Sequence, residues 1–289
     1  MATLGQWVEG SRPRTLPAAI APVVVGTGLA INLDSLRVDR AGLALVVALA
    51  LQVGVNFAND YSDGIRGTDN KRVGPVRLVG QQLARPQTVR LAAFIAFGTA
   101  CLAGLALVLA TLAWWLLLVG AACVAAAWLY TGGPKPYGYH GLGEVFVLVF
   151  FGVVPVVGTF YVQSETITLA AVTASIGVGA LACAVLITNN LRDLPGDQEV
   201  GKYTLAVRLG DHRTRLLYVA CIATAATTTV LVAAFLSWLI MLALAVLVMA
   251  PIRLVLGGAG GTALIPALKK TGLLVLIYGL GLGLLIALA

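Results

Sequence analysis

The sequence predicts an all-α integral membrane protein, with about nine transmembrane helices bundled as two pseudosymmetric halves around a central cavity. Of its 289 residues, 60% are hydrophobic and 11% are charged, whereas a soluble chain carries roughly 25% charged residues. Apolar runs recur along the whole chain and approach the ~20 residues that cross a hydrocarbon core about 30 Å thick. We therefore expect residues 1–289 to form a single transmembrane domain.

Charged residues and breaks rich in Gly or Pro divide the apolar runs into separate helices. Before the first helix, Trp7, Arg12 and Arg14 are typical of an interfacial anchor. The N-terminal stretch lacks the apolar core and cleavage site of a signal peptide, so we expect no processing there. The nine expected helices cover approximately residues 15–32, 41–58, 89–110, 112–130, 143–162, 168–188, 215–234, 238–255 and 271–288.

The distribution of basic residues predicts the orientation of the chain. With the N-terminus on one side, the loops on that side carry 17 of the 19 Lys and Arg residues, and only Arg37 and Arg40 fall on the other. Because Lys and Arg concentrate in cytoplasmic loops, we expect a multi-pass plasma membrane protein with a cytoplasmic N-terminus, a cavity open to the cytoplasm and an external C-terminus. This asymmetry also explains the net charge of +7, so no nucleic-acid partner is expected.

The first of two acidic segments lies at the cytoplasmic end of the second expected helix. Its sequence is NFANDYSDGIRGTD, which ends at Asp69. If that helix continues far enough, four polar residues fall at i, i+3, i+4 and i+7 and share one face. These residues are Asn56, Asn59, Asp60 and Asp63.

The second acidic segment repeats this pattern about 130 residues later. Asn189 and Asp193 share a helix face at i, i+4, and Pro195 is expected to end the helix so that Asp197 lies on the following turn. The repeat of Asn-Asp-x-x-Asp as Asn-Asn-x-x-Asp indicates two related halves that enclose one site.

The composition of both segments favours a magnesium site. Five of the twelve acidic residues lie in these two motifs, and oxygen ligands without nearby His or Cys suit a hard cation such as Mg²⁺, which prefers a few carboxylates plus phosphate oxygens. A solvated acidic loop is the alternative. Neighbouring basic residues would bind phosphate oxygens, and they are Arg66, Lys71, Arg72, Arg77, Arg192, Lys202 and Arg208. The expected partner is a diphosphate with a long hydrocarbon tail.

The paired motifs resemble those of the UbiA superfamily of intramembrane prenyltransferases, which carry an NDxxD-type first motif and a DxxxD second motif on cytoplasmic loops of a nine-helix bundle. Residues Asn59 to Asp63 match the first motif, and Asp193 to Asp197 match the second. The resemblance covers essentially the whole chain. It implies an enzyme that transfers the prenyl group of a polyprenyl diphosphate with Mg²⁺ as cofactor.

Longer strings resemble the branch of this superfamily that prenylates 1,4-dihydroxy-2-naphthoate in menaquinone synthesis. These strings are NDYSDGIRGTD, RVGPVRLVG, YTGGPKPYGY and GKYTLAVRLG. In the first string, Asp69 follows Asp63 by six residues rather than by the four of the commoner spacing, which favours this branch. The implied reaction joins the prenyl group to the carboxylate-bearing ring carbon and releases CO₂ and diphosphate, giving demethylmenaquinone.

The resemblance also implies a role for each matching residue. Asn59 and Asn189 would support the metal ligands, and Asn56 would lie deeper, nearer the acceptor. The metal ligands would be Asp60, Asp63, Asp69, Asp193 and Asp197, of which all but Asp69 form the expected catalytic set. The residues expected to contact the leaving diphosphate are Lys71, Arg72, Arg192 and Lys202.

A turn-rich connector, YTGGPKPYGY, supplies further candidates. Tyr137 or Tyr139 would orient the acceptor hydroxyl and Lys135 its carboxylate. Tyrosines of an interfacial aromatic belt are the alternative.

Three other functions remain as alternatives. A cation-coupled transporter also combines repeated halves with polar residues at broken helices, but its site usually lies near the bilayer midplane. A CDP-alcohol phosphotransferase carries its aspartates in one contiguous motif rather than in two distant ones. Within the superfamily, 4-hydroxybenzoate, homogentisate or haem would replace naphthoate as acceptor if the cavity had a different shape.

Overall fold

The computed structural model describes residues 2–67, 76–232 and 237–289, and each regular element in these ranges is a helix. The short α1 (Leu4–Gly10) precedes the bundle, and a π-helical segment, Leu148–Val153, joins α6 to α7. The other helices are α2 (Pro17–Asn32), α3 (Val38–Arg66), α4 (Pro86–Thr111), α5 (Leu116–Leu129), α6 (Gly143–Val147), α7 (Val154–Ser164), α8 (Leu169–Glu199), α9 (Leu205–Val232), α10 (Ser237–Leu256) and α11 (Ile265–Leu288).

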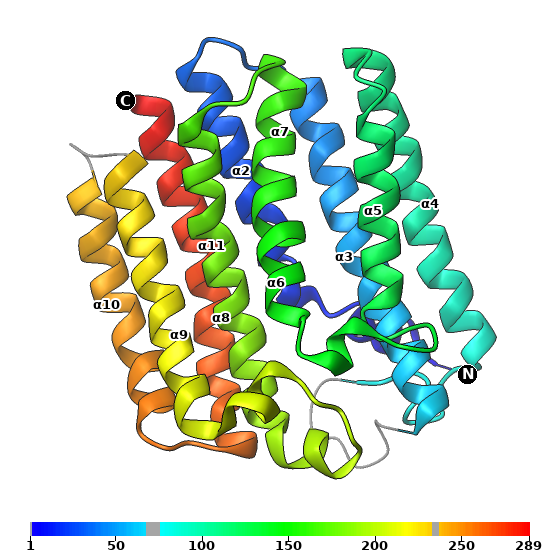
Figure 1. Cartoon of the computed structure of the whole chain (residues 1–289). Helices are drawn as coiled ribbons and strands as arrows, with labels where there is room; N and C mark the ends of the chain where they lie inside the picture. Colours follow the sequence, from blue (N-terminus) through cyan, green and yellow to red (C-terminus); the bar gives the residue numbers. More distant parts are fainter. Residues whose placement is uncertain (1, 68–75, 233–236) are drawn as a thin grey trace.

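The helices run side by side, and the two chain ends lie at opposite ends of the bundle (Figure 1). Helices α8 to α11 gather on one side, α3 to α5 on the other, and α6 and α7 lie between them. The largest core cluster joins the first group to α2 and α7 and includes Val25, Phe160, Leu181, Tyr218 and Tyr278. A smaller cluster around Phe57 and Phe97 joins α3 to α4.

The length and composition of the helices make this an integral membrane protein. Among the described residues, six helical stretches are long and apolar enough to cross a membrane, and a seventh forms if Leu4–Thr15 and Pro17–Asn32, bent by 49°, are one span. Leu116–Leu129 and Ala245–Leu256 are apolar but shorter. The sequence predicted about nine transmembrane helices, whereas the described residues contain six or seven helical stretches with the length of a full span.

Close packing of the first and last helices depends on glycine. A Cβ on Gly28 of α2 would collide with the backbone of Gly283 in α11, and one on Gly279 would lie 2.5 Å from the Ala21 side chain. Small residues let membrane helices approach closely where no water drives their association. This contact fixes the N-terminal segment against the bundle, beside the cavity described below.

Both helices that carry acidic motifs continue beyond their apolar spans. Helix α3 reaches Arg66 and is capped by Gly67, whose φ of 73° is left-handed, so the polar stripe is helical as predicted. The prediction that Pro195 ends its helix is wrong, because α8 continues to Glu199. A proline removes one helical hydrogen bond, to the carbonyl four residues earlier, and the final turn is closed by Val200 N–H donating to Gly196 O and Lys202 N–H to Asp197 O.

Candidate active site

A cavity of about 1360 Å³ runs through the bundle between the two helix groups. Residues of α2, α3, α4, α5, α6, α7, α8 and α11 line it. The polar lining gathers where α3 and α8 end, with Asn59, Asp63, Asn189, Arg192 and Lys202. Toward the other end, the wall is made mainly of Ala, Val, Leu, Phe and Gly side chains. The cavity therefore has one polar end and a long apolar remainder.

The polar stripe of α3 forms one wall of the polar end. Asn56, Asn59 and Asp63 all line the cavity. Asn59 Oδ1 accepts a 2.8 Å hydrogen bond from the Thr131 hydroxyl, and Asp63 Oδ1 accepts one of 2.8 Å from the Tyr139 hydroxyl. The connector between α5 and α6 thus fixes two of the predicted site residues.

Asp60 has different contacts, although it lies on the same stripe. Its two carboxylate oxygens accept the backbone N–H groups of Leu78 at 2.7 Å and Val79 at 3.1 Å. Its exposed fraction is 1%, and it is not among the cavity-lining residues of the described chain. Asp60 therefore holds the segment that follows α3 against the helix, and this places Arg77, which does line the cavity.

The second acidic segment is built around Arg192. Its guanidinium donates from Nε to Asp193 Oδ1 and from Nη2 to Asp193 Oδ2, each at 2.7 Å, and from Nη2 to Asn189 Oδ1 at 2.8 Å. One turn further along α8, Asp197 pairs with Lys202 Nζ at 3.5 Å. In the described structure the cavity is lined by Asn189, Arg192 and Lys202, whereas Asp193 and Asp197 are not among its lining residues.

Tyr139 links the two acidic segments. Its hydroxyl donates to Asp63, and Lys202 Nζ lies 5.2 Å from the centroid of its ring. The Arg66 guanidinium lies 5.5 Å from the same centroid. Since Lys202 also pairs with Asp197, a continuous series of contacts joins the end of α3 to the end of α8. The structure thus brings the two motifs to one place, as the sequence repeat predicted.

Several predicted residues contribute differently from expectation. Lys135 is exposed, and Arg66 donates to the carbonyls of Thr131 and Gly133, so in the described structure both stand outside the cavity lining. Tyr137 lines the cavity, but its hydroxyl donates to Ala126 O at 2.8 Å and burial raises the pKa of the phenol. Asp69, Lys71 and Arg72 lie outside the described residues.

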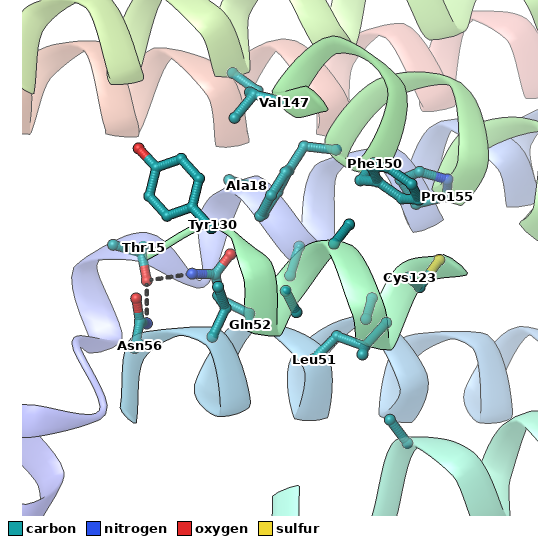
Figure 2. Close-up of a pocket in the computed structure, with 18 of the residues that line it drawn as sticks. Thr15, Ala18, Leu51, Gln52, Asn56, Cys123, Tyr130, Val147, Phe150 and Pro155 are labelled. Atoms are coloured by element: carbon teal, nitrogen blue, oxygen red, sulfur yellow. Dashed lines mark hydrogen bonds between the residues drawn. The ribbon is translucent and has the colours of Figure 1, made fainter. Parts of the chain in front are cut away.

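The sequence reading missed a polar cluster next to Asn56. Figure 2 shows that the Thr15 hydroxyl oxygen accepts hydrogen bonds from two side-chain amides, that of Gln52 at 3.0 Å and that of Asn56 at 2.9 Å. The Thr15 hydroxyl donates its own hydrogen bond to Arg12 O at 2.9 Å. Because its proton is used there, its oxygen acts as an acceptor for both amides, and this fixes their orientation. The Gln52 carbonyl oxygen is buried, and no described residue forms a hydrogen bond with it. Gln52 precedes Asn56 by one helical turn, so extending the stripe backwards would have found it.

Two arginines assigned to an interfacial anchor also lie at the cavity. Arg12 and Arg14 line its wall together with Lys269 of α11. Arg12 has a left-handed backbone with a φ of 55°, which is rare for a residue other than glycine. Strained residues of this kind concentrate at functional sites. The polar end therefore carries more positive charge than the two motifs alone predicted.

The donor set suits a magnesium ion that is shared with a substrate. Among the described residues, no three His, Cys, Asp or Glu side chains converge as a ready metal site. Mg²⁺ is usually bound by one or two carboxylates together with phosphate oxygens rather than by a complete protein cage. The oxygen donors at the polar end are therefore chemically suited to Mg²⁺ once a diphosphate supplies the remaining ligands.

Comparison with known proteins assigns this architecture to a family. The model of the UbiA prenyltransferase family matches residues 19–258. A 1,4-dihydroxy-2-naphthoate octaprenyltransferase from Mycobacterium tuberculosis is 52% identical over 97% of this chain and 96% of its own. An enzyme of the same name from Escherichia coli is 44% identical over 75% of this chain and 72% of its own.

Solved structures share the fold at much lower sequence identity. A UbiA homolog from Archaeoglobus fulgidus, bound to GPP and Mg²⁺, superposes with a TM-score of 0.69 at 14% identity, over 96% of this chain and 99% of its own. An apo UbiA homolog from Aeropyrum pernix K1 has a TM-score of 0.68 at 14% identity, over 93% of this chain and 98% of its own. These likenesses concern the fold alone.

Proposed function

The chain belongs to the UbiA prenyltransferase family, and from this premise we propose that it transfers a polyprenyl group from polyprenyl diphosphate to 1,4-dihydroxy-2-naphthoate. The observation that carries the proposal is a single cavity with a charged end and a long apolar remainder. It fits a donor with an anionic head and a hydrocarbon tail. The naphthoate acceptor follows from the M. tuberculosis relative, which shares 52% of residues over nearly the whole chain.

The diphosphate head binds at the polar end. Arg77, Arg192 and Lys202 line the cavity there, and arginine and lysine are the usual donors to phosphate oxygens. Their positive charge stabilises the negative charge that develops on the leaving diphosphate. The predicted ligands Lys71 and Arg72 would add to this set.

Asp63, Asp193 and Asp197 are the residues that would hold Mg²⁺ together with the diphosphate oxygens, with Asn59 and Asn189 beside them. When bound, Mg²⁺ supplies charge neutralisation to the departing diphosphate. Asp60 and Asp69 remain predicted ligands, and Asp60 would have to release two backbone N–H groups to take that role.

The acceptor ring is placed next to the polar end, against Thr15, Gln52 and Asn56 (Figure 2). The amide nitrogens of Gln52 and Asn56 are held by Thr15. The Asn56 carbonyl oxygen would accept a naphthol hydroxyl, and the buried Gln52 oxygen would do so after its side chain turns toward the cavity. Arg12 and Arg14 are the nearest basic residues of the N-terminal segment and attract the acceptor carboxylate.

The proposed reaction needs no nucleophilic side chain from the protein. The allylic C–O bond of the donor breaks, and its electron pair leaves with the diphosphate. The ring carbon that bears the carboxylate forms the new C–C bond, and loss of CO₂ restores aromaticity, so no ring proton has to be removed. The apolar wall excludes water, which would otherwise capture the allylic cation.

The polar end faces the cytoplasm of a plasma membrane protein, and the C-terminus lies outside. The support is the charge asymmetry of the loops, in which 17 of the 19 basic residues fall on the side of the two motifs. Water-soluble acceptor and Mg²⁺ would then reach the site from the cytoplasm.

The proposal is tested with the purified protein, Mg²⁺, a polyprenyl diphosphate and either 1,4-dihydroxy-2-naphthoate or 4-hydroxybenzoate, with products identified by mass. We expect the prenylated, decarboxylated naphthalenediol, which is the reduced form of demethylmenaquinone, and at most traces of prenylated hydroxybenzoate. Prenylated hydroxybenzoate alone would overturn the choice of acceptor, and the absence of both products would overturn prenyl transfer.

A further inference from the structure

The apolar end of the cavity lies against a small core cluster formed by four helices. Ala44 of α3, Leu107 of α4 and Val162 of α7 form a buried cluster against which Leu116 of α5 packs. All four residues line the cavity. We call these four residues the floor.

A polar tie outside the floor holds three of these helices together. Arg40 of α3 donates from Nη1 to Val162 O and from Nη2 to Ala110 O, each at 2.8 Å, and its Nη1 lies 3.0 Å from Glu165 Oε1. These bonds join α3, the end of α4 and the end of α7. They hold three of the four helices that carry the floor in fixed positions relative to one another.

Three glycines lie one helical turn inside the floor. Gly104 precedes Leu107 on α4, Gly120 follows Leu116 on α5, and Gly158 precedes Val162 on α7; all three line the cavity. We call Gly104, Gly120 and Gly158 the glycine ring. In the described part of the chain, no packing neighbour lies within 4 Å of the position that a Cβ would take on any of them. They leave open space where a side chain would stand.

Other glycines of the bundle are used for packing instead. Added Cβ atoms on Gly26 and Gly54 would lie 2.6 Å and 2.5 Å from Val156 O and Phe97 Cε1, respectively. Close contact between helices therefore requires glycine at Gly26 and Gly54, whereas no such contact requires glycine at the positions of the glycine ring. The ring widens the cavity at one depth.

The distance from the polar end to the floor suits an extended prenyl tail better than an aromatic acceptor. Asn59 and Ala44 both line the cavity and lie on α3, about 22 Å apart along the helix axis at roughly 1.5 Å per residue. An aromatic acceptor held at the polar end would leave the far part of this length empty. A prenyl tail whose diphosphate lies at Arg192 and Lys202 would extend into it.

We propose that the glycine ring determines which prenyl chain lengths this protein accepts, by leaving room for the distal isoprene units of the donor above the floor. The proposal rests on the proposed prenyl transfer and adds a specificity-determining element to it. A short donor ends before the ring, so its binding does not depend on the ring. A long donor reaches the ring and requires the space.

The test replaces Gly120 or Gly158 by Phe and measures kcat/KM for geranyl diphosphate and for octaprenyl diphosphate with the same acceptor. We expect activity with the short donor to stay within about twofold, because a short tail ends before the substituted position. The long-to-short ratio of kcat/KM should fall about tenfold or more, which corresponds to about 1.4 kcal/mol, because Phe fills space that the long tail needs. Gly120→Ala and Gly158→Ala should give a smaller change in the same direction.

Gly42→Phe on α3 and Gly98→Phe on α4 are the matched controls. Both glycines are exposed, likewise have open space at the Cβ position, and are outside the cavity lining in the described structure. The controls should leave the long-to-short ratio unchanged.

An unchanged ratio in Gly120→Phe and Gly158→Phe, with the short donor still used, would overturn the inference, because the tail would then leave the protein by another path. If the Phe variants lose activity with both donors, the Ala variants provide the test. An unchanged long-to-short ratio of kcat/KM in the Ala variants would equally overturn the inference. Failure of the proposed function is distinct, since the unmodified protein would then form no prenylated product from either donor.

Discussion

The two acidic segments share a sequence pattern, but different groups hold their carboxylates in place. In the first, Asp60 binds two backbone N–H groups and Asp63 accepts a tyrosine hydroxyl. In the second, Asp193 and Asp197 are paired with Arg192 and Lys202. Neutral N–H and O–H groups therefore help to hold the carboxylates of the first segment, and cationic side chains help to hold those of the second. The two copies of the motif position their carboxylates through different contacts.

This difference gives each half a task during donor binding. Arg192 and Lys202 can exchange their carboxylate partners for phosphate oxygens, because Arg and Lys form strong charge-assisted hydrogen bonds with either anion. On the proposed function, this exchange would free Asp193 and Asp197 to bind Mg²⁺. Donor and Mg²⁺ are therefore expected to bind more tightly together than apart.

The largest effect is expected from Asp63→Asn, because it removes the negative charge that faces the cavity in the first segment. Turnover should fall at least about a hundredfold, the cost of losing one electrostatic contact that stabilises the transition state. Asp39→Asn, at the opposite end of α3 and exposed, is the matched control and should leave turnover unchanged. An active Asp63→Asn protein would remove Asp63 from the metal site.

Arg192→Lys should produce the next largest effect. Lysine cannot reproduce the paired hydrogen bonds to Asp193 or the added bond to Asn189. We expect the donor KM to rise about thirtyfold, which corresponds to roughly 2 kcal/mol, with a smaller change in the acceptor KM. Arg213→Lys, an exposed residue on α9, serves for comparison. Equal increases in both KM values would argue against a diphosphate contact.

Asp60→Asn separates the two aspartates of the first motif. An amide accepts one of the two N–H groups and repels the other, so the segment that carries Arg77 loosens. The donor KM should rise about fivefold, from roughly 1 kcal/mol for a lost hydrogen bond, and the Mg²⁺ concentration for half-maximal activity should stay within about twofold of its usual value. A shift of that Mg²⁺ midpoint as large as in Asp63→Asn would instead restore Asp60 as a metal ligand.

The smallest effect is expected from Tyr139→Phe, which removes the hydroxyl bound to Asp63 but keeps the ring under Lys202. Asp63 keeps its charge, and a water molecule in the cavity takes the place of the lost hydroxyl, so kcat/KM should fall only about threefold. Tyr203→Phe, an exposed tyrosine close in sequence, should cause no change. A loss as large as that in Asp63→Asn would mean that the hydroxyl acts on substrate directly.

Periodicity predicted those features of the site that depend on local sequence. Asn56, Asn59 and Asp63 line the cavity because they recur at helical spacing on α3, and the charge count correctly grouped the ends of α3 and α8. The UbiA resemblance is confirmed by the family match. The same spacing placed Asp60 with these residues, yet its contact with Leu78 depends on how a later segment folds back.

The features that the sequence reading missed depend on contacts between distant residues. Thr15 meets Gln52 and Asn56 only because α2 and α3 pack side by side, and Tyr139 meets Asp63 across 76 positions. The Pro195 prediction failed for a different reason, because a single missing N–H does not unwind a helix whose next turn is closed by other bonds. Local rules do not encode either kind of compensation.

The central claim is that the two acidic segments form one site that binds diphosphate and Mg²⁺ together. The most direct measurement is the affinity of the purified protein for a polyprenyl diphosphate at increasing Mg²⁺ concentration, by calorimetry. We predict that Mg²⁺ increases donor affinity at least about tenfold, a coupling of roughly 1.4 kcal/mol, and that Asp63→Asn removes the increase. Donor affinity that is independent of Mg²⁺ in the unmodified protein would contradict the claim.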